Sequence, residues 1–262
     1  GNTDIIKFLS VDAIDYCTFG NSKPFRIKVR NILNDNYTYF YVKKADASRV
    51  YGLELEHILS PDKIHFLVYK DTLIEEHIMG IPGDVFMETL LKNCSEVEKA
   101  QIAKEFVKFN ERCMIRLLGD MRAYNYVIVP IHDFDHVVYK IRPIDFDQQC
   151  YEGNFKIYRP QFFKENYKMV LLVKDKLQDS SIEQYKNEER SALAKRIHSA
   201  ENRINMLIEI MSNDTIAPEN HIQQLKNELF SFTNDLNFKK SNSMGEILNA
   251  GFEFVMRNFK NS

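Results

Sequence analysis

The chain has 262 residues, which is enough to bury a substantial core in one large domain or in two closely packed lobes. Its hydrophobic fraction of 44% is that of an ordinary globular protein. The formal net charge of −2 argues against a dedicated nucleic-acid-binding protein, because such proteins need a basic surface to displace counterions.

Cysteine usage and hydropathy narrow the class further. The four cysteines lie far apart and form no Cys-x-x-Cys pair, which argues against a zinc knuckle or a disulfide framework. Reduced thiols in a cytoplasmic protein are the simplest interpretation. The longest apolar runs, such as MVLLV at 169–173, are too short to span a bilayer, so we expect no membrane partner.

The first third of the chain predicts β-strands and one helix. Three segments are rich in the β-branched and aromatic residues that suit a pleated sheet: 13–17, 25–32 and 37–44. A helix is predicted over 47–59, where apolar residues recur at helical spacing before a proline. Two further segments predict strands joined by a tight turn, which completes the order β-β-β-α-β-β: 64–70 and 72–79.

From residue 84 onward the pattern is mostly helical. The segments VFMETLLKN and EVEKAQIAKEFVKFNERCMIRLL have helical periodicity, and two short strands, YVIVP and VVYKIRPID, follow them. Heptad-like seams at 193–211 and 222–236 then predict two antiparallel helices that form a hairpin. We expect this hairpin to pack on itself or on the rest of the protein, and homodimerisation through these C-terminal helices is the alternative.

Three short motifs occur in order on this framework. FYVK ends at Lys43 on a predicted strand, GDMRAYN (119–125) follows a long helix, and IDFD (144–147) follows the strand hairpin. Each has an ordinary explanation when taken alone: Lys43 as a solvated strand end, Asp120 as a helix terminator, IDFD as a strand that runs into a turn. Their joint occurrence, each on the expected type of element, favours a shared site.

This combination resembles the protein-kinase-like superfamily, in which a third-strand lysine, a catalytic loop and a metal-binding segment follow one another. GDMRAYN is closest in form to the HGDLHxxN loop of aminoglycoside and choline phosphotransferases, and IDFD is similar to their IDFDDA. Asp147, which stands where protein kinases have a glycine, agrees with that group. The matching motifs fall within about residues 13–150.

The resemblance implies an α+β fold of two lobes. The N-terminal lobe would be a five-stranded antiparallel nucleotide-binding sheet with one helix. The C-terminal lobe would be mostly helical, would carry the catalytic loop and the metal-binding segment, and would end in the helical hairpin. The corresponding ranges are 1–78 for the first lobe, 79–262 for the second, 118–129 for the loop, 144–147 for the metal-binding segment and 182–262 for the C-terminal helices.

The resemblance also implies roles in binding ATP and Mg²⁺. Lys43 would contact the α- and β-phosphates, oriented by Glu54 on the following helix or alternatively by Glu56. Asn125 and Asp145 would supply hard oxygen ligands to Mg²⁺. Catalysis would then consist mainly of positioning and charge stabilisation.

Asp120 would accept the proton of a substrate hydroxyl. Arg122 would reach the transferring phosphoryl group, or would simply cover the acidic loop. Gly20 and Ser22, in the loop TFGNSKP, would lie over the phosphates. The connector Glu75–Ile78 would read the adenine base through its backbone, and the contacts are expected at two positions: Glu76 and Ile78.

We therefore expect an ATP- and Mg²⁺-dependent phosphotransferase that acts on a hydroxyl of a small molecule. The segment after IDFD has no APE motif, which disfavours a protein substrate. The alternative is a pseudokinase that binds a nucleotide or a protein without transfer. The single glycine of the phosphate loop and the Leu118-Gly119 pair, in place of the expected His, support that alternative. Transfer of the nucleotide instead of the phosphate is a third interpretation.

Overall fold

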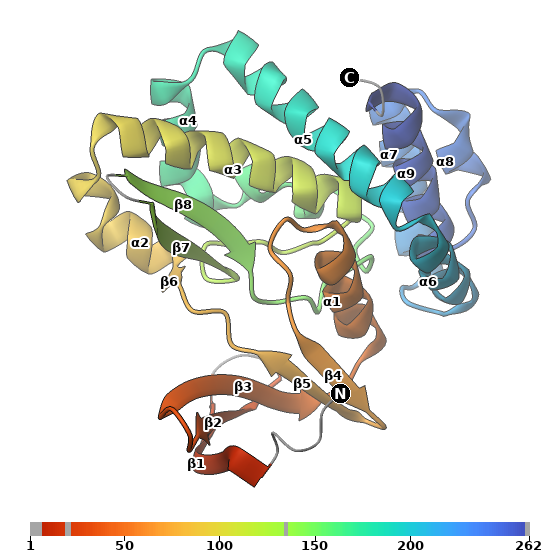
Figure 1. Ribbon diagram of the computed structural model, residues 1–262. Helices are drawn as coiled ribbons and strands as arrows, with labels where there is room; N and C mark the ends of the chain where they lie inside the picture. The colour runs from red at the N-terminus through yellow and green to blue at the C-terminus, as the bar shows by residue number, and fades with distance from the viewer. Residues whose placement is uncertain (1–6, 19–21, 134–135, 260–262) are drawn as a thin grey trace.

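The computed structural model describes residues 7–18, 22–133 and 136–259, and its fold is α+β. Figure 1 shows a β-sheet at the N-terminal end of the chain and a mostly helical part at the other end. One helix, α1 (Ala47–Leu59), lies between them.

The N-terminal sheet has five antiparallel strands, as predicted from the sequence. They lie in the order β1-β2-β3-β5-β4, and their bounds are Leu9–Tyr16, Phe25–Asn31, Asn36–Lys44, Thr72–Glu76 and Phe66–Tyr69 in that spatial order. The turn between β2 and β3 contains Asp35 at φ 54°, a left-handed conformation that Asp tolerates better than most residues. Helix α1 follows β3 and begins at Asp46, whose side chain accepts a hydrogen bond from Arg49 N at 2.9 Å.

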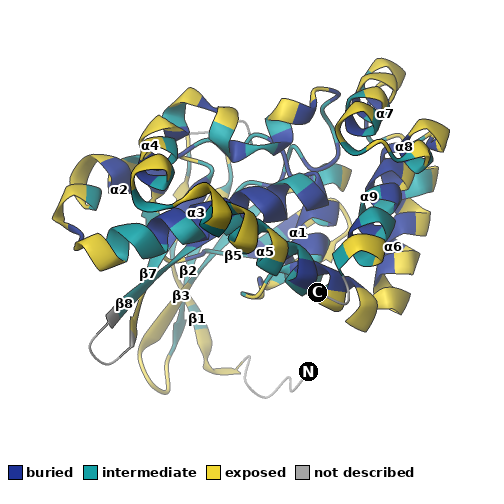
Figure 2. Ribbon diagram, turned by 90° about the horizontal axis from the view of Figure 1, so that it is seen from above, coloured by how far each residue is buried: buried dark blue, intermediate teal, exposed yellow. Residues whose placement is uncertain are grey.

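Helix α1 belongs to the hydrophobic core of the helical part. Its buried Leu55 and Leu59 pack in the same cluster as the C-terminal helices, and Figure 2 colours the buried residues of these helices dark blue. Glu56 also forms an ion pair with Arg116, and both side chains are only 2% exposed. The predicted boundary between the two lobes at residue 78 stays a prediction. Helix α1 precedes that boundary in the sequence, but it packs in the core formed with helices that follow the boundary.

The second part of the chain contains a small sheet covered by helices. Its strands lie in the order β6-β7-β8, with bounds Ile81–Pro82, Tyr126–Asp133 and His136–Pro143. The β7–β8 hairpin was predicted, whereas β6 was not. The helices here are α2 (Gly83–Thr89), α3 (Glu96–Arg116) and α4 (Tyr167–Lys176), with short 3-10 turns at Leu91–Asn93, Phe155–Tyr158, Pro160–Phe162 and Lys164–Asn166.

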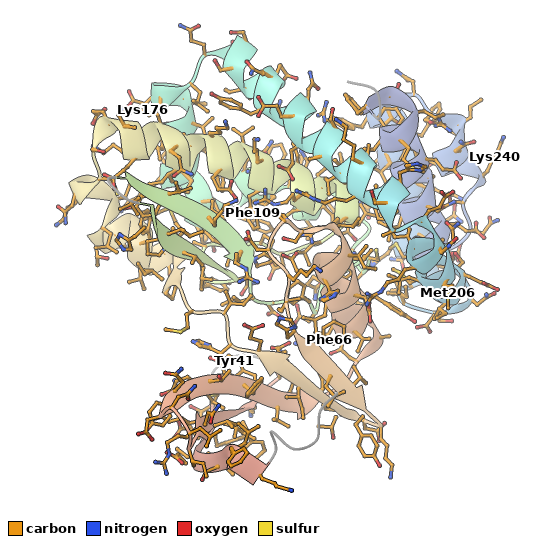
Figure 3. The ribbon with its side chains drawn as sticks, in the orientation of Figure 1. Tyr41, Phe66, Phe109, Lys176, Met206 and Lys240 are labelled. Atoms are coloured by element: carbon orange, nitrogen blue, oxygen red, sulfur yellow. The ribbon has the colours of Figure 1, made fainter. Side chains whose placement is uncertain are left out.

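The C-terminal helices differ from the predicted hairpin. Their bounds are Asp179–Ser199 for α5, Glu201–Asn213 for α6, Glu219–Thr233 for α7, Leu236–Lys240 for α8 and Met244–Phe259 for α9. The seam over 193–211 breaks at Ala200, α5 packs against α3 and α9, and α6 packs mainly against α9 rather than against α7. The prediction of one two-helix hairpin is therefore wrong, because the heptad pattern continues through the break without a Pro or Gly to mark it. Met206 on α6 and Lys240 on α8 are exposed on the outer surface (Figure 3).

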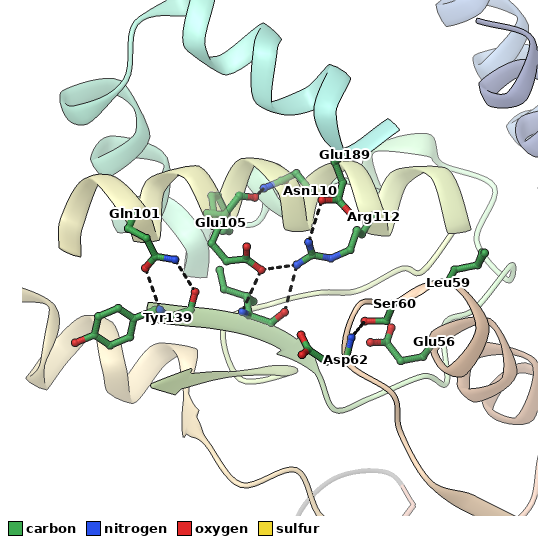
Figure 4. A network of polar contacts seen from close by, with 12 residues as sticks. Glu56, Leu59, Ser60, Asp62, Gln101, Glu105, Asn110, Arg112, Tyr139 and Glu189 are labelled. Carbon is green, nitrogen blue, oxygen red and sulfur yellow. Dashed lines mark hydrogen bonds and ion pairs between the residues drawn. The ribbon is translucent and has the colours of Figure 1, made fainter. Parts of the chain in front are cut away.

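A polar network fastens β8 to α3 and α5 (Figure 4). The Arg112 guanidinium lies 2.6 Å from Glu105 Oε1 and 3.5 Å from Glu189 Oε2, and it donates to the Ile141 carbonyl at 3.4 Å. Gln101 exchanges two hydrogen bonds of 2.9 and 3.0 Å with the backbone of Tyr139. Because β8 runs directly into residues 144–147, this network sets the position of that segment.

The four cysteines are free thiols, as predicted. Within the described ranges, no helix combines the length and the apolar character that a bilayer span requires.

Candidate active site

The loop after α3 is held in an unusual backbone conformation. Leu117 caps the helix with φ 53°, and Asp120 has φ 55°. Non-glycine residues in this left-handed region cost about 1–3 kcal/mol each and persist only where the surroundings fix them. Here Gly119 N donates to Gln148 O, and Asp120 N donates to Ile157 O, both at 3.1 Å. The loop is therefore fixed by chain segments that follow IDFD.

The Asp120 carboxylate lies between a basic and an amide side chain. It accepts a hydrogen bond from Arg122 Nε at 2.7 Å and one from Asn125 Nδ2 at 3.3 Å. Arg122 also pairs with Glu165 at 3.0 Å. The Asp120 side chain is 31% exposed, so it is accessible from solvent.

Asn125 connects this loop to the IDFD segment. Its Nδ2 also donates to the Asp120 carbonyl at 2.7 Å, so the amide nitrogen faces Asp120, and no described residue donates a hydrogen bond to its Oδ1. Ile144 N donates to the Asn125 carbonyl at 3.0 Å, which places Asp145 beside the loop. The Asp145 side chain is 33% exposed.

The pKa of Asp147 is affected by acids from several parts of the chain. Its burial raises its pKa to about 6, and the negative charges of Asp145, Asp120 and Asp46 add to the rise while Arg49 opposes it. Charges act on a pKa in this way only at short range in a partly buried site. Carboxylates from three separate segments of the chain therefore share one region.

The third motif enters this region from the N-terminal sheet. Lys43 on β3 forms an ion pair with Glu75 on β5, and each side chain is 6% exposed. Lys43 pairs in register with Leu73, so Glu75, two residues further along β5, lies on the same face of the sheet. Burial raises the pKa of Glu75, Lys43 and Arg49 lower it, and Asp145 raises it further. The Lys43–Glu75 pair is thus close to the IDFD segment.

Arg49 joins α1 to IDFD and was not predicted. Its guanidinium pairs with Asp46, and its Nη2 lies 3.4 Å from Asp147 Oδ2 and 3.7 Å from Asp145 Oδ1. The close approach depends on Gly52, because a Cβ at that position would lie 2.9 Å from the Cβ of Phe146 in IDFD. The Asp46 cap is a sequence signal for the local contact with Arg49, whereas nothing in the sequence marks a contact 98 residues away.

The expected partner of Lys43 was wrong. Glu54 pairs with Arg203 on α6, and Glu56 pairs with the buried Arg116 on α3. Both acids therefore bind cations of the helical part. Glu75 takes the place that was predicted for them, because it lies on the strand next to Lys43.

The other predicted nucleotide contacts are not brought to this cluster by any described hydrogen bond or ion pair. Gly20 lies outside the described residues, and Ser22 lies in the β1–β2 connection. Glu76 N donates to His65 O at 2.9 Å and is used by the fold. Ile78 is buried, and its N–H has no hydrogen-bond acceptor among the described residues. Of the connector residues Glu75–Ile78, Ile78 therefore keeps a backbone N–H that is available to a nucleobase.

The donor set of the cluster suits a divalent cation completed by a ligand. No group of three or more His, Cys, Asp or Glu side chains in the described ranges is arranged to hold a metal by itself. Mg²⁺ usually takes one or two protein oxygens together with substrate phosphates and water. Asp145 and the Asn125 amide offer two such oxygens. The buried Glu75 Oε2 also has no hydrogen-bond partner, which fits a site that is completed by a further group.

A separate cavity of about 290 Å³ lies among α3, α7 and α9. Among the described residues that line it, Arg190 is the one charged side chain, and it already pairs with Glu111 at 2.8 Å. The described lining of this cavity lacks the acid–base groups of the cluster. The candidate site is therefore placed at the cluster and not at this cavity.

No protein-family model matches the chain, and no curated protein matches its sequence.

Proposed function

We propose that this chain is an ATP- and Mg²⁺-dependent phosphotransferase of two-lobed, kinase-like architecture that phosphorylates a hydroxyl of a small molecule. One observation carries the proposal. Lys43, the loop with Asp120 and Asn125, and the segment with Asp145 come from distant parts of the sequence, yet they converge on one charged cluster through Glu75 and Asp147. The same three motifs carry the resemblance in sequence.

Each residue has a task that its surroundings support. The buried Lys43 ammonium would bind phosphate oxygens while Glu75 fixes its position. Asp145 and Asn125 would hold Mg²⁺, which when bound neutralises charge on the phosphates. Arg122 keeps Asp120 in one orientation, with Nε 2.7 Å from its carboxylate.

The transfer step is a displacement at the γ-phosphorus. The substrate hydroxyl oxygen would form a bond to that phosphorus as its bond to the β-γ bridging oxygen breaks, so that ADP leaves with the bonding electrons. The hydroxyl proton would pass to the Asp120 carboxylate. Because this carboxylate is partly exposed, it can face an incoming hydroxyl.

The chain after IDFD supports a small substrate. Residues 155–166 fold into short 3-10 turns, and the Ile157 carbonyl accepts a hydrogen bond from Asp120 N. This stretch is compact and hydrogen-bonded to the Asp120 loop. It does not form an extended surface on which a protein substrate would bind.

The contact of Arg49 with Asp145 and Asp147 favours the second candidate, a pseudokinase, because these carboxylates already have a cation. The two functions predict different results with Mg-ATP. Thermal unfolding should show stabilisation in both, by about 2.7 kcal/mol at a hundred times the Kd. Conversion of ATP to ADP with a matching phosphorylated hydroxyl compound is expected only for the phosphotransferase, whereas release of pyrophosphate would indicate nucleotide transfer.

The decisive variant is Asp145→Asn, which should abolish stabilisation by Mg-ATP. Lys44→Met is the matched control for Lys43→Met, because Lys44 is the exposed neighbour on the same strand. We expect Lys43→Met to lose nucleotide binding and Lys44→Met to keep it. No thermal shift of the wild type at millimolar Mg-ATP would contradict the proposed function.

A further inference from the structure

The candidate site holds more acidic than basic side chains. Around the Arg49 guanidinium stand Asp46, Asp145 and Asp147, and the ion pair between β3 and β5 lies beside them. Two positive side chains thus face four negative ones, an excess of two negative charges. The triphosphate is itself strongly negative, so cations must offset both sets of charge before it binds.

Arg49 is fixed in this site by the helix that carries it. One turn later Gly52 lies against Phe146, and after a further turn Glu56 forms its buried pair with Arg116. Removing one partner of such a pair typically costs about 3–5 kcal/mol. Helix α1 therefore cannot readily swing away to withdraw Arg49 when a nucleotide enters.

Arg49 engages the two acids of IDFD unequally. Its Nη2 lies 3.4 Å from Asp147 Oδ2 and 3.7 Å from Asp145 Oδ1. The Asp145 side chain is also the more exposed of the two. Asp147 is thus the acid of IDFD that lies nearer to the guanidinium, while Asp145 and Asn125 keep oxygens for one ion.

We propose, as an extension that rests on the proposed function, that Arg49 is a fixed cation standing in for a second metal ion. One divalent cation then enters with each nucleotide and is bound by Asp145 and Asn125, and Asp147 is not a metal ligand. Arg49 is then a positioning residue: its fixed positive charge lowers the number of metal ions that bind with each nucleotide from two to one. The chain would differ in this respect from kinases whose site holds two Mg²⁺ ions.

Equilibrium dialysis with Mn²⁺ and a non-hydrolysable ATP analogue tests this without relying on turnover. The first measurement is the number of Mn²⁺ ions bound per bound nucleotide at saturation of the wild type. The second is the affinity for the analogue while free Mn²⁺ is raised tenfold, starting from the level at which all analogue is already a 1:1 complex with Mn²⁺. We expect one Mn²⁺ per nucleotide and an affinity that changes less than about twofold, because no further ion is taken up.

Arg49→Met removes the fixed charge. Its nucleotide affinity should then rise about tenfold over the same Mn²⁺ range, because a second ion becomes coupled to binding. The double variant Arg49→Met/Asp147→Asn removes one cation and one acid together, and should return to a flat dependence. Arg203→Met is the control. It removes, from α6, the exposed partner of Glu54, which lies on the same helix as Arg49, and it should behave as wild type. If Arg49→Met does not fold, the hydrogen-bonding Arg49→Gln takes its place.

Two results would overturn this inference and leave the proposed function standing. One is two Mn²⁺ ions per nucleotide in the wild type. The other is the same flat dependence in wild type and Arg49→Met. Failure of the wild type to bind the analogue at any Mn²⁺ concentration would instead overturn the proposed function, and the inference with it.

Discussion

Lys43 and Glu75 form a buried ion pair between the neighbouring strands β3 and β5. The cation of the proposed phosphate site is therefore positioned within the sheet itself. A helix that moved relative to the sheet would not break this pair. Positioning of Lys43 should accordingly depend on the sheet register and not on α1.

The first prediction concerns the stability of this pair. Lys43→Met or Glu75→Ala should each lower the free energy of unfolding by about 3 kcal/mol, because the remaining charge is left buried without a partner. The double variant Lys43→Met/Glu75→Leu should recover much of the loss, since no charge remains. Denaturant unfolding measures all three, and single-variant losses below about 1 kcal/mol would contradict the buried pair.

A second prediction separates two acids on α1. Glu56→Ala should destabilise the protein by about 3–5 kcal/mol, because Arg116 is almost fully buried. Glu54→Ala should change stability by no more than about 1 kcal/mol, because its pair with Arg203 is exposed. Glu54→Ala should also keep the nucleotide-dependent thermal shift, and losing it would restore the role that the sequence suggested for Glu54.

Much of the N-terminal fold could be predicted because its signals are local. Residue type and alternation located the strands, and the predicted helix over 47–59 coincides with α1. The break at Ala200 could not be predicted, because an alanine there carries no local signal and the packing of α5 and α6 on α9 decides it. Strand β6 has only two residues, which is too short for any pattern.

The site shows the same limit. The motifs predict Lys43, Asp120, Asn125 and Asp145 as site residues, but the neighbours of these residues depend on sheet order and helix rotation. Glu75 meets Lys43 only because β5 lies beside β3, although the two strands are separated along the chain by α1 and β4. Helix rotation likewise turns Arg49, and not an acid of α1, toward IDFD.

A third prediction tests the packing of α9 through two of its glycines. A Cβ on Gly245 would lie 2.5 Å from Ser212 N on α6, so Gly245→Ala should destabilise the protein by about 1–3 kcal/mol. Among the described residues, a Cβ on Gly251 would meet only the Ile115 carbonyl, at 4.0 Å. Gly251→Ala should therefore stabilise the helix by about 0.5–1 kcal/mol. Equal effects of the two changes on thermal unfolding would mean that α9 does not pack on α6 as described.

A fourth prediction concerns the proposed base. Asp120→Asn keeps a residue that tolerates positive φ, so its stability should stay within about 1 kcal/mol of wild type. Its kcat for phosphoryl transfer should fall by about 10²–10⁴, because the amide cannot accept the hydroxyl proton. The exposed Asp71→Asn is the control and should leave kcat unchanged. A kcat for Asp120→Asn within twofold of wild type would exclude Asp120 as the base.

The most direct test of the central claim is a crystal structure with Mn²⁺ and a non-hydrolysable ATP analogue, in which anomalous scattering locates the metal. We predict one Mn²⁺ within about 2.0–2.3 Å of Asp145 and Asn125 oxygens and of phosphate oxygens, with the Lys43 ammonium on the same triphosphate. A nucleotide bound elsewhere on the protein, or a metal held apart from Asp145 and Asn125, would contradict the account.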